Sequence, residues 1–455
     1  MSMCTTSSIR STARSWLPAL ALLLLSGMSY ALEDKLVIVT SLPKDLTDPF
    51  NAAFQRMHPG TRLEILNKNT SAGVTYIEET VRNNSSDLFW VSAPDAFTVL
   101  KSKGLLQRYQ PNATGIPDNM GSFPINDPDG YFFGFAASGY GIMYNTRYLK
   151  AKKLPAPREW HDLTRPVYYG HVGMSAPSRS GTTHLTVEVI LQGEGWKEGW
   201  GLIKAMAGNF KTITERSFGV PDGVNSGAFG IGIVIDYFGY TSKASGFPVE
   251  FVYPTNTALV PASVGMVEGA PHPKAAGAFI DFLLSDQGQE ILFDPRIQRL
   301  PVKPAIYAKA PPGLPDPFKD RSIGATIPFD ARLSEARYNV INSLFDHMIT
   351  FRSAELRAAT KAIDKAQKAL VGKPNADAQA LVAEARSLVA ATPVTEAQAS
   401  DPAYAAIFEA KQMKPSDAVP QRQAKVEQQW DRFIRRNYQD ARQRAEQALS
   451  TTRKH

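Results

Sequence analysis

The first hundred residues alternate short, β-branched apolar runs with segments whose apolar residues recur every three or four positions. The first pattern predicts buried strands, and the second predicts amphipathic helices. We expect strands at residues 35–40, 61–66 and 86–91, and helices at residues 45–57, 72–83 and 93–103. Strands that alternate with helices form βαβ units, which need a mostly parallel sheet covered by helices. This alternation therefore restricts the chain to an α/β fold.

The chain has 455 residues, which is more than one hydrophobic core usually holds, so we expect more than one domain. Two extended stretches, at residues 131–145 and 251–261, predict crossings between two lobes. The predicted division is lobe 1 at residues 32–135 and 260–350, and lobe 2 at residues 136–259. Within lobe 2, residues 185–207 predict one long helix.

The last hundred residues differ in composition from the rest. From about residue 353 the chain is rich in Ala, Lys, Glu and Gln, and Leu356, Ala359 and Ile363 keep helical spacing. A second apolar stripe includes Trp430. We predict a helical C-terminal extension at residues 351–455, built as an α-hairpin plus a terminal helix. We expect it to pack on the first lobe.

The N-terminus has the features of a signal peptide. Arg10 and Arg14 precede an apolar run, and a small-residue cleavage site ends at Ala31. We predict a signal peptide at residues 1–31, cut after Ala31; the alternative is an uncleaved membrane anchor. The single cysteine, Cys4, would leave with it, so the mature chain would have no disulfide and no thiolate metal site.

Charge and motifs exclude several functions. The formal net charge of +7 is mild for this length, and no dense Lys/Arg block with interleaved aromatic residues occurs, so we expect no nucleic-acid partner. None of the common zinc-protease, serine-hydrolase, nucleotide-binding or dinucleotide-binding motifs occurs in a matching context. We therefore expect no enzyme activity and no cofactor or metal site.

The stretch PSRSGTTH at residues 177–184 lies where a strand should pass into a helix. A helix N-terminus offers unpaired N–H groups and partial positive charge, and this turn adds hydroxyls, a glycine and cationic side chains. Such a turn suits phosphate, phosphonate or carboxylate; the alternative is an ordinary helix cap. The candidate ligand-binding residues of the turn are Ser178, Arg179, Ser180, Gly181, Thr182, Thr183 and His184.

Further candidates follow other predicted strands, at the edge of the sheet where α/β proteins bind ligands. Ser41, Trp90 and Ser92 belong to the first lobe, although a tryptophan at a strand end is more often a core residue. Asp236 follows the apolar run IGIVI and could accept hydrogen bonds from a ligand, or simply cap a helix.

The stretch HPKAAGAFIDFLLSDQGQEIL at residues 272–292 predicts two helices broken at Ser285. It resembles the late helix of solute-binding proteins of bacterial ABC importers, a likeness that covers roughly residues 35–345. The stretches SAPSRSGTTH and RSFGVPDGVNSGAFGIGIVID look most like the branch that contains ferric-iron, hexose-phosphate, phosphoglycerate and phosphonate binders.

This resemblance implies a two-lobed, type II-like periplasmic-binding-protein fold that closes around a small organic phosphate or phosphonate and delivers it to an ABC transporter permease. It also assigns roles to residues of both lobes. Ser178, Ser180, Thr182 and Thr183 would hold the phosphoryl group, with Ser41 and Ser92 facing them. Ser217, Asn225 and Asp236 would bind the organic part.

Two alternatives remain. Ferric binders of this branch use adjacent tyrosines where this chain has Tyr237 and Phe238, which disfavours iron, although Tyr240 is close by in sequence. The other alternative is a ligand-sensing regulator, whose extension at residues 351–455 docks on a membrane sensor kinase.

Overall fold

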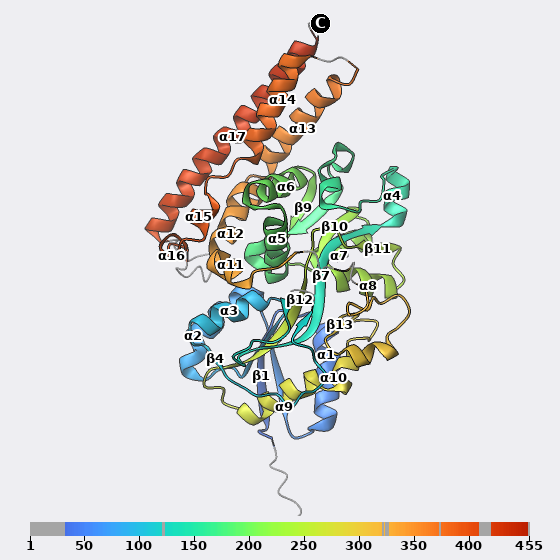
Figure 1. Ribbon diagram of the computed structural model, residues 1–455, viewed down its shortest axis with the longest axis vertical. Coiled ribbons are helices and arrows are strands. Elements are labelled where there is room, and N and C mark those ends of the chain that lie inside the picture. Colours follow the sequence, from blue (N-terminus) through green and yellow to red (C-terminus); the bar gives the residue numbers. More distant parts are fainter. Residues whose placement is uncertain are drawn as a thin grey trace, which may run out of the picture.

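The computed structural model describes residues 32–120, 123–320, 323, 327–372, 375–408 and 420–453. The signal peptide predicted at residues 1–31 lies outside the described residues. Figure 1 shows two α/β lobes, one above the other, with long helices projecting from the upper lobe. This architecture confirms the predicted two-lobed α/β fold with a helical C-terminal extension.

The first lobe begins with the predicted alternation of strands and helices. Its first elements are β1 (Lys35–Thr40), α1 (Lys44–Met57), β2 (Arg62–Asn67), α2 (Thr70–Thr80), β3 (Leu88–Val91) and α3 (Pro94–Ser102). The strand β1 pairs in parallel with both β2 and β3. All four residues of β3 are buried, as its continuous apolar sequence requires in a sheet covered on both faces.

One long strand belongs to the sheets of both lobes. The strand β7 (Phe133–Asn145) pairs with β12 (Leu259–Val267) through its first half and with β10 (Ile231–Ile235) through its second half. The strands follow the order β2-β1-β3-β12-β7-β10-β8-β9, so β7 passes from the sheet of one lobe into the sheet of the other. The predicted boundary between residues 135 and 136 falls inside this strand.

The second lobe consists of a sheet covered by helices. Its elements are β8 (Val172–Ser175), α5 (Gly181–Glu194), α6 (Trp196–Gly208), β9 (Phe210–Thr214), α7 (Gly219–Ser226), β10, α8 (Asp236–Ala244) and β11 (Val249–Val252). The single helix predicted over residues 185–207 is wrong, because the chain breaks into α5 and α6 at Gly195. This glycine has φ +84°, a left-handed conformation that only glycine adopts readily.

The remaining elements of the two lobes are two helices after β12 and several short segments. The helices α9 (Pro273–Leu284) and α10 (Asp286–Ile291) confirm the predicted pair, and the Ser285 hydroxyl caps the second helix. The other elements are β13 (Leu300–Pro301), α11 (Ala331–Ala336), α12 (Tyr338–Phe345), the short strands β4 (Leu106–Gln107), β5 (Asn119–Met120) and β6 (Phe123–Pro124), and α4 (Thr146–Lys152). Although the sequence division placed residues 260–350 in the first lobe, the buried side chains of α12 pack into the core of the second lobe.

The extension contains α13 (Ser353–Ala369), α14 (Ala376–Ala390), α15 (Glu396–Ala399), α16 (Pro402–Ala405) and α17 (Gln421–Arg453). Figure 1 shows α13, α14 and α17 side by side. The apolar stripe of Leu356, Ala359 and Ile363 is buried, and both α13 and α14 pack on α6. The extension therefore shares a core with the second lobe, whereas the sequence favoured packing on the first.

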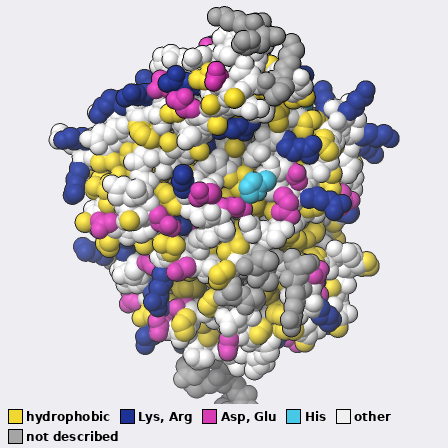
Figure 2. All heavy atoms as spheres, turned by 45° about the horizontal axis from the view of Figure 1, so that its top comes forward, with side chains coloured by type: hydrophobic (Ala, Val, Ile, Leu, Met, Phe, Trp, Pro, Cys, Tyr) yellow, Lys and Arg dark blue, Asp and Glu magenta, His cyan; other side chains and the backbone are white. Residues whose placement is uncertain are grey.

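The surface carries charges of both signs. On the face shown in Figure 2, Lys and Arg side chains lie mainly near the rim and are interrupted by Asp, Glu and apolar side chains. In the part of the chain that the structure describes, no helix combines the length and the apolar character that a membrane crossing requires.

Candidate ligand-binding site

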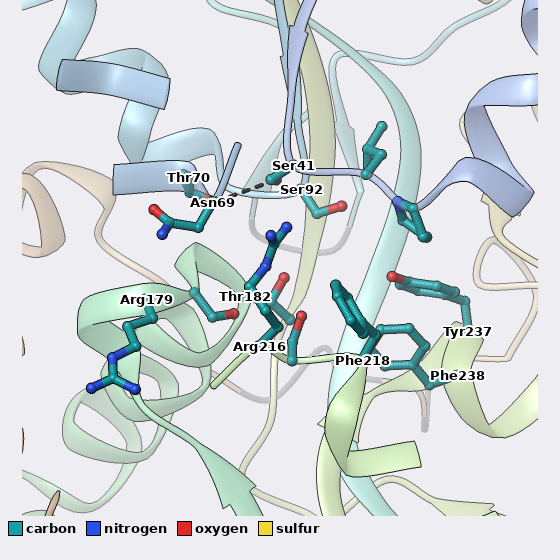
Figure 3. Close-up of a pocket in the computed structure, with 14 residues that line it drawn as sticks. Ser41, Asn69, Thr70, Ser92, Arg179, Thr182, Arg216, Phe218, Tyr237 and Phe238 are labelled. Atoms are coloured by element: carbon teal, nitrogen blue, oxygen red, sulfur yellow. Dashed lines mark hydrogen bonds between the residues drawn. The ribbon is translucent and has the colours of Figure 1, made fainter. Parts of the chain in front are cut away.

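A pocket lies between the two lobes, at the ends of the strands (Figure 3). The first lobe contributes the loop after β1, the start of α2 and the residue after β3. The second lobe contributes the turn before α5, the loop after β9 and the start of α8. The lining residues are Ser41, Leu42, Pro43, Asn69, Thr70, Ser92, Arg179, Ser180, Thr182, Arg216, Ser217, Phe218, Tyr237 and Phe238.

The lobes are almost closed on each other. The free space inside the pocket is about 20 Å³, which is room for about one water molecule. A wider cavity of about 440 Å³ adjoins it and shares Pro43, Phe218, Tyr237 and Phe238. An organic ligand can therefore enter the pocket only when the lobes move apart.

The turn at residues 177–184 forms a helix N-terminus, as predicted. The Ser180 hydroxyl caps α5 by accepting a hydrogen bond from the Thr183 N–H at 3.2 Å. This contact leaves the Ser180 hydroxyl proton available to a ligand. Gly181 and Thr182 occupy the first turn of α5, where backbone N–H groups have no partner within the helix.

A second helix N-terminus faces the first across the pocket. Asn69 caps α2 by accepting a hydrogen bond from the Ala72 N–H at 2.8 Å. The adjacent Thr70 hydroxyl donates to the Ser41 hydroxyl at 3.3 Å, the dashed line in Figure 3. Two helix dipoles thus direct their positive ends at one space, which favours an anion there.

Two arginines line the pocket and have different roles. Arg179 forms an ion pair with the exposed Glu215, and Figure 3 shows its guanidinium directed away from the other labelled residues. Arg216 instead extends its guanidinium toward Ser41 and Ser92, where burial lowers its pKa. Arginine remains charged nonetheless, so Arg216 supplies the cation of the pocket.

Three predicted residues lie outside the pocket in tightly packed surroundings. Trp90 is buried in the aromatic core of the first lobe, with its ring centroid 5.4 Å from that of Phe279. Thr183 points inward, and its hydroxyl bonds that of Ser175. His184 is completely buried and bonds Asn342 at 2.8 Å; burial lowers its pKa to about 4, so the ring is neutral and gives the pocket no charge.

Three other predicted residues also lie elsewhere. Asp236 is buried and accepts hydrogen bonds from the Gly139 N–H at 2.7 Å and the Tyr253 hydroxyl at 2.8 Å, while burial raises its pKa to about 6. Its oxygens are used to hold the crossing strand. Asn225 lines the adjoining cavity, and Ser178 lines another cavity beside the extension.

The pocket therefore unites six predicted side chains with several that the sequence interpretation missed. The predicted ones that line it are Ser41, Ser92, Arg179, Ser180, Thr182 and Ser217, while Gly181 lies directly beside it. Asn69, Thr70 and Arg216 were missed. Each stands between a strand and a helix, the same position that selected the other candidates, so that rule could have found them.

Tyr237, which the sequence offered as a possible iron ligand, lines the pocket. Burial raises the pKa of Tyr237, which opposes formation of a tyrosinate ligand. The Tyr240 hydroxyl donates to the Tyr253 hydroxyl at 3.1 Å. In the described ranges, no three His, Cys, Asp or Glu side chains come together as a metal site.

Two lobes that enclose a small polar pocket and share the strand β7 define a binding protein for a small solute. Residues 83–323 match the family described as bacterial extracellular solute-binding protein, and the chain belongs to this family. The resemblance found in residues 272–292 is thereby confirmed.

The relatives agree with this assignment. The chain is 32% identical over 390 residues to the phosphoglycerate transport regulatory protein PgtC of Salmonella typhimurium, which covers 85% of this chain and 92% of PgtC. AfuA from Actinobacillus pleuropneumoniae, with fructose-6-phosphate bound, matches with TM-score 0.63 at 20% identity, over 70% of this chain and 98% of AfuA. Iron-bound HitA from Pseudomonas aeruginosa matches with TM-score 0.56 at 20% identity, over 66% of this chain and 95% of HitA. The two structures share the fold.

Proposed function

We propose that the protein captures a small organic phosphate or phosphonate in the periplasm and delivers it to the permease of an ABC importer. The observation that carries this proposal is the convergence of two helix N-termini and the Arg216 guanidinium on one pocket. No Asp or Glu is among the pocket's lining residues in the described part of the chain. A site with many donors and no carboxylate favours an anion.

The proposed ligand contacts come from both lobes. Thr182, Ser180 and the N–H groups of α5 hold the phosphoryl oxygens from the second lobe, and Ser41, Ser92 and Thr70 close on them from the first. Because the donors are fixed by the fold, little ordering is needed on binding. The ligand stabilises the closed arrangement, in which it contacts both lobes at once. The names of PgtC and of the AfuA complex, which concern phosphorylated small molecules, support this ligand class.

A thermal-shift screen of residues 32–455 tests the proposal. A ligand at 100 times its Kd stabilises the native state by about 2.7 kcal/mol. We expect 3-phosphoglycerate, fructose 6-phosphate or 2-aminoethylphosphonate to raise the melting temperature by about 3 °C. Glycerate and fructose are the matched controls, and equal shifts with and without the phosphoryl group would contradict the proposal.

Gly181 allows the lobes to close on each other. A Cβ atom on this residue would lie 2.6 Å from the Ala93 Cβ and 2.9 Å from the Thr70 Cγ2, both in the first lobe. We expect Gly181→Ala to hold the lobes apart and to weaken organic-phosphate binding about tenfold, with ligand-free stability retained. Titration calorimetry measures the affinity. Gly60→Ala is the control, since its Cβ would meet open space; equal affinities for both variants would show that closure at Gly181 is unimportant.

Ferric iron is a second candidate ligand, favoured by the shared fold with iron-bound HitA and by Tyr237 at the pocket wall. A tyrosinate–iron bond absorbs visible light, so the iron-loaded protein would be coloured. A colourless protein after loading with ferric citrate would remove this candidate.

A regulatory role is favoured by the extension. The match with PgtC spans 390 residues and so includes part of the extension. The match with AfuA spans nearly all of AfuA but only 70% of this chain. The extension could therefore report ligand binding to a membrane sensor kinase. Deleting it would expose the core that it shares with the second lobe, so surface variants are the better test. Arg432→Glu with Arg435→Glu, both exposed on α17, should abolish signalling with ligand affinity unchanged; intact signalling would argue against this docking face.

A further inference from the structure

Arg299 lies between α10 and β13, against the ring of Tyr237, which lines the pocket. We call this place the base of the cleft. Its side chain is completely buried, with 0% of its surface exposed. None of its three guanidinium nitrogens has a hydrogen-bond partner among the described residues, and it forms no ion pair with any of them. A buried cation normally forms hydrogen bonds or an ion pair, because an isolated charge away from water is strongly unfavourable.

Within the described part of the chain, the surroundings of Arg299 offer no hydrogen-bond acceptor to its three nitrogens. The guanidinium carbon lies 3.9 Å from the ring centroid of Tyr237, and burial raises the pKa of that hydroxyl, so Tyr237 is neutral. Asp236 is the neighbouring carboxylate; burial raises its pKa to about 6, and the positive charge of Arg299 opposes this rise. Its oxygens accept hydrogen bonds from the Gly139 N–H, the Tyr253 hydroxyl and the Tyr237 N–H, and none from Arg299. Arginine stays protonated in proteins, so the buried side chain of Arg299 keeps its positive charge.

Other polar groups without partners lie near this guanidinium. Leu300 pairs with Ala137 in an antiparallel ladder, so the register continued by one residue sets Arg299 opposite Ser138, on the same face of the sheet. The hydroxyls of Ser138 and Tyr140 are buried without a partner among the described residues. The Ser92 hydroxyl, which lines the pocket, is also buried without a hydrogen-bond partner among the described residues. Donors thus accumulate at the base of the cleft.

We propose that Arg299 is a ligand-binding residue that anchors an anionic group of the solute at the base of the cleft, in a second anion subsite distinct from the α5 turn. This inference rests on the proposed function, since it assigns the phosphoryl group to the turn and a second anionic group to Arg299. A carboxylate suits this place because its two oxygens match the planar fork of a guanidinium. The ligand class is then a small phosphorylated carboxylic acid.

The route to this subsite passes Tyr237. Its ring lines the pocket and also lies against the Arg299 guanidinium. In the nearly closed arrangement the pocket has about 20 Å³ of free space. A carboxylate can reach the guanidinium only if the lobes move apart and the Tyr237 ring turns.

A matched pair of probes tests the subsite. 3-Phosphoglycerate and glycerol 3-phosphate have the same phosphorylated carbon chain, but the first ends in a carboxylate and the second in a hydroxymethyl group. We expect Arg299→Met to weaken 3-phosphoglycerate binding about 100-fold in calorimetry and glycerol 3-phosphate binding less than about threefold. Arg299→Lys, which keeps the charge and loses the fork, should give an intermediate loss.

Stability measurements separate ligand binding from a structural role. Because the Arg299 guanidinium forms no hydrogen bond with the described residues, the melting temperature of ligand-free Arg299→Met should stay close to that of the wild type. The control is Arg357→Met, because Arg357 also lies over a tyrosine ring, 5.0 Å from that of Tyr169, but outside both cavities. It should bind both probes as the wild type does.

Several results would overturn the inference. One is an equal loss for both probes in Arg299→Met and Arg299→Lys, and another is a large fall in ligand-free melting temperature, either of which indicates a structural role. A third is that chloride stabilises the wild type but not Arg299→Met, while each probe binds these two proteins with equal affinity. This result indicates that Arg299 binds an inorganic ion. If the wild type binds neither probe nor any other organic phosphate or phosphonate of the thermal-shift screen, the proposed function fails. Malonate then decides about the subsite: stabilisation that disappears in Arg299→Met supports it, and no stabilisation refutes it.

Discussion

Replacing Arg216 with alanine is expected to weaken the binding of 3-phosphoglycerate about 100-fold, because a charge-assisted hydrogen bond contributes about 1.5–3 kcal/mol. Arg216 is the cation whose guanidinium extends into the pocket toward Ser41 and Ser92. It also reaches the first lobe, where it donates to the Asn67 side-chain oxygen at 3.4 Å. Its loss therefore removes both charge attraction and a contact that helps the lobes close.

The neighbouring arginine is the matched control. Arg179 lines the same pocket but forms an ion pair with the exposed Glu215 and points away. Arg179→Ala should change the affinity less than about threefold, since exposed ion pairs contribute little. Titration calorimetry at two salt concentrations measures both variants, and a larger effect for Arg179 than for Arg216 would reverse the assignment of the pocket's cation.

The sequence predicted the architecture because its signals are local. The alternation over residues 35–103 and the spacing of Leu356, Ala359 and Ile363 each depend on neighbours within one element. The start of α5 was also predictable, because Ser180 and Gly181 are typical of a helix beginning. Where the extension packs was not, because α6 and α13 are distant in sequence and meet only in the folded chain.

The candidate site was only partly predictable for the same reason. Ser180, Thr182 and His184 stand within one turn, but the first two line the pocket, whereas His184 faces the interior. Which side of a helix faces the cleft depends on the element packed against it, here the segment that contains Ser334 and Asn342. Likewise, only the packing of the two lobes decides that Arg216, and not Arg179, points inward.

The largest expected loss of stability comes from breaking the buried ion pair between Glu188 on α5 and Arg337, which precedes α12. The Arg337 guanidinium donates to both carboxylate oxygens of Glu188 on α5, at 2.9 and 2.8 Å, and both side chains are fully buried. A third bond reaches Glu396 on α15 at 2.7 Å. We expect Arg337→Met to lower the free energy of unfolding by about 3–5 kcal/mol, because it leaves the Glu188 carboxylate buried without its cation.

Replacing both partners tests this explanation. Glu188→Met combined with Arg337→Met should recover much of the stability lost by the single variant, because no uncompensated charge remains. Lys243→Met breaks an exposed pair with Glu250 and should cost less than about 1 kcal/mol. Urea denaturation followed by circular dichroism gives the midpoints. If the double variant is no more stable than Arg337→Met, the loss arises from the packing of Arg337 over the Trp196 ring, 5.2 Å away, and not from the isolated carboxylate. In either case Arg337 connects α5, which begins at the pocket, to Glu396 of the extension.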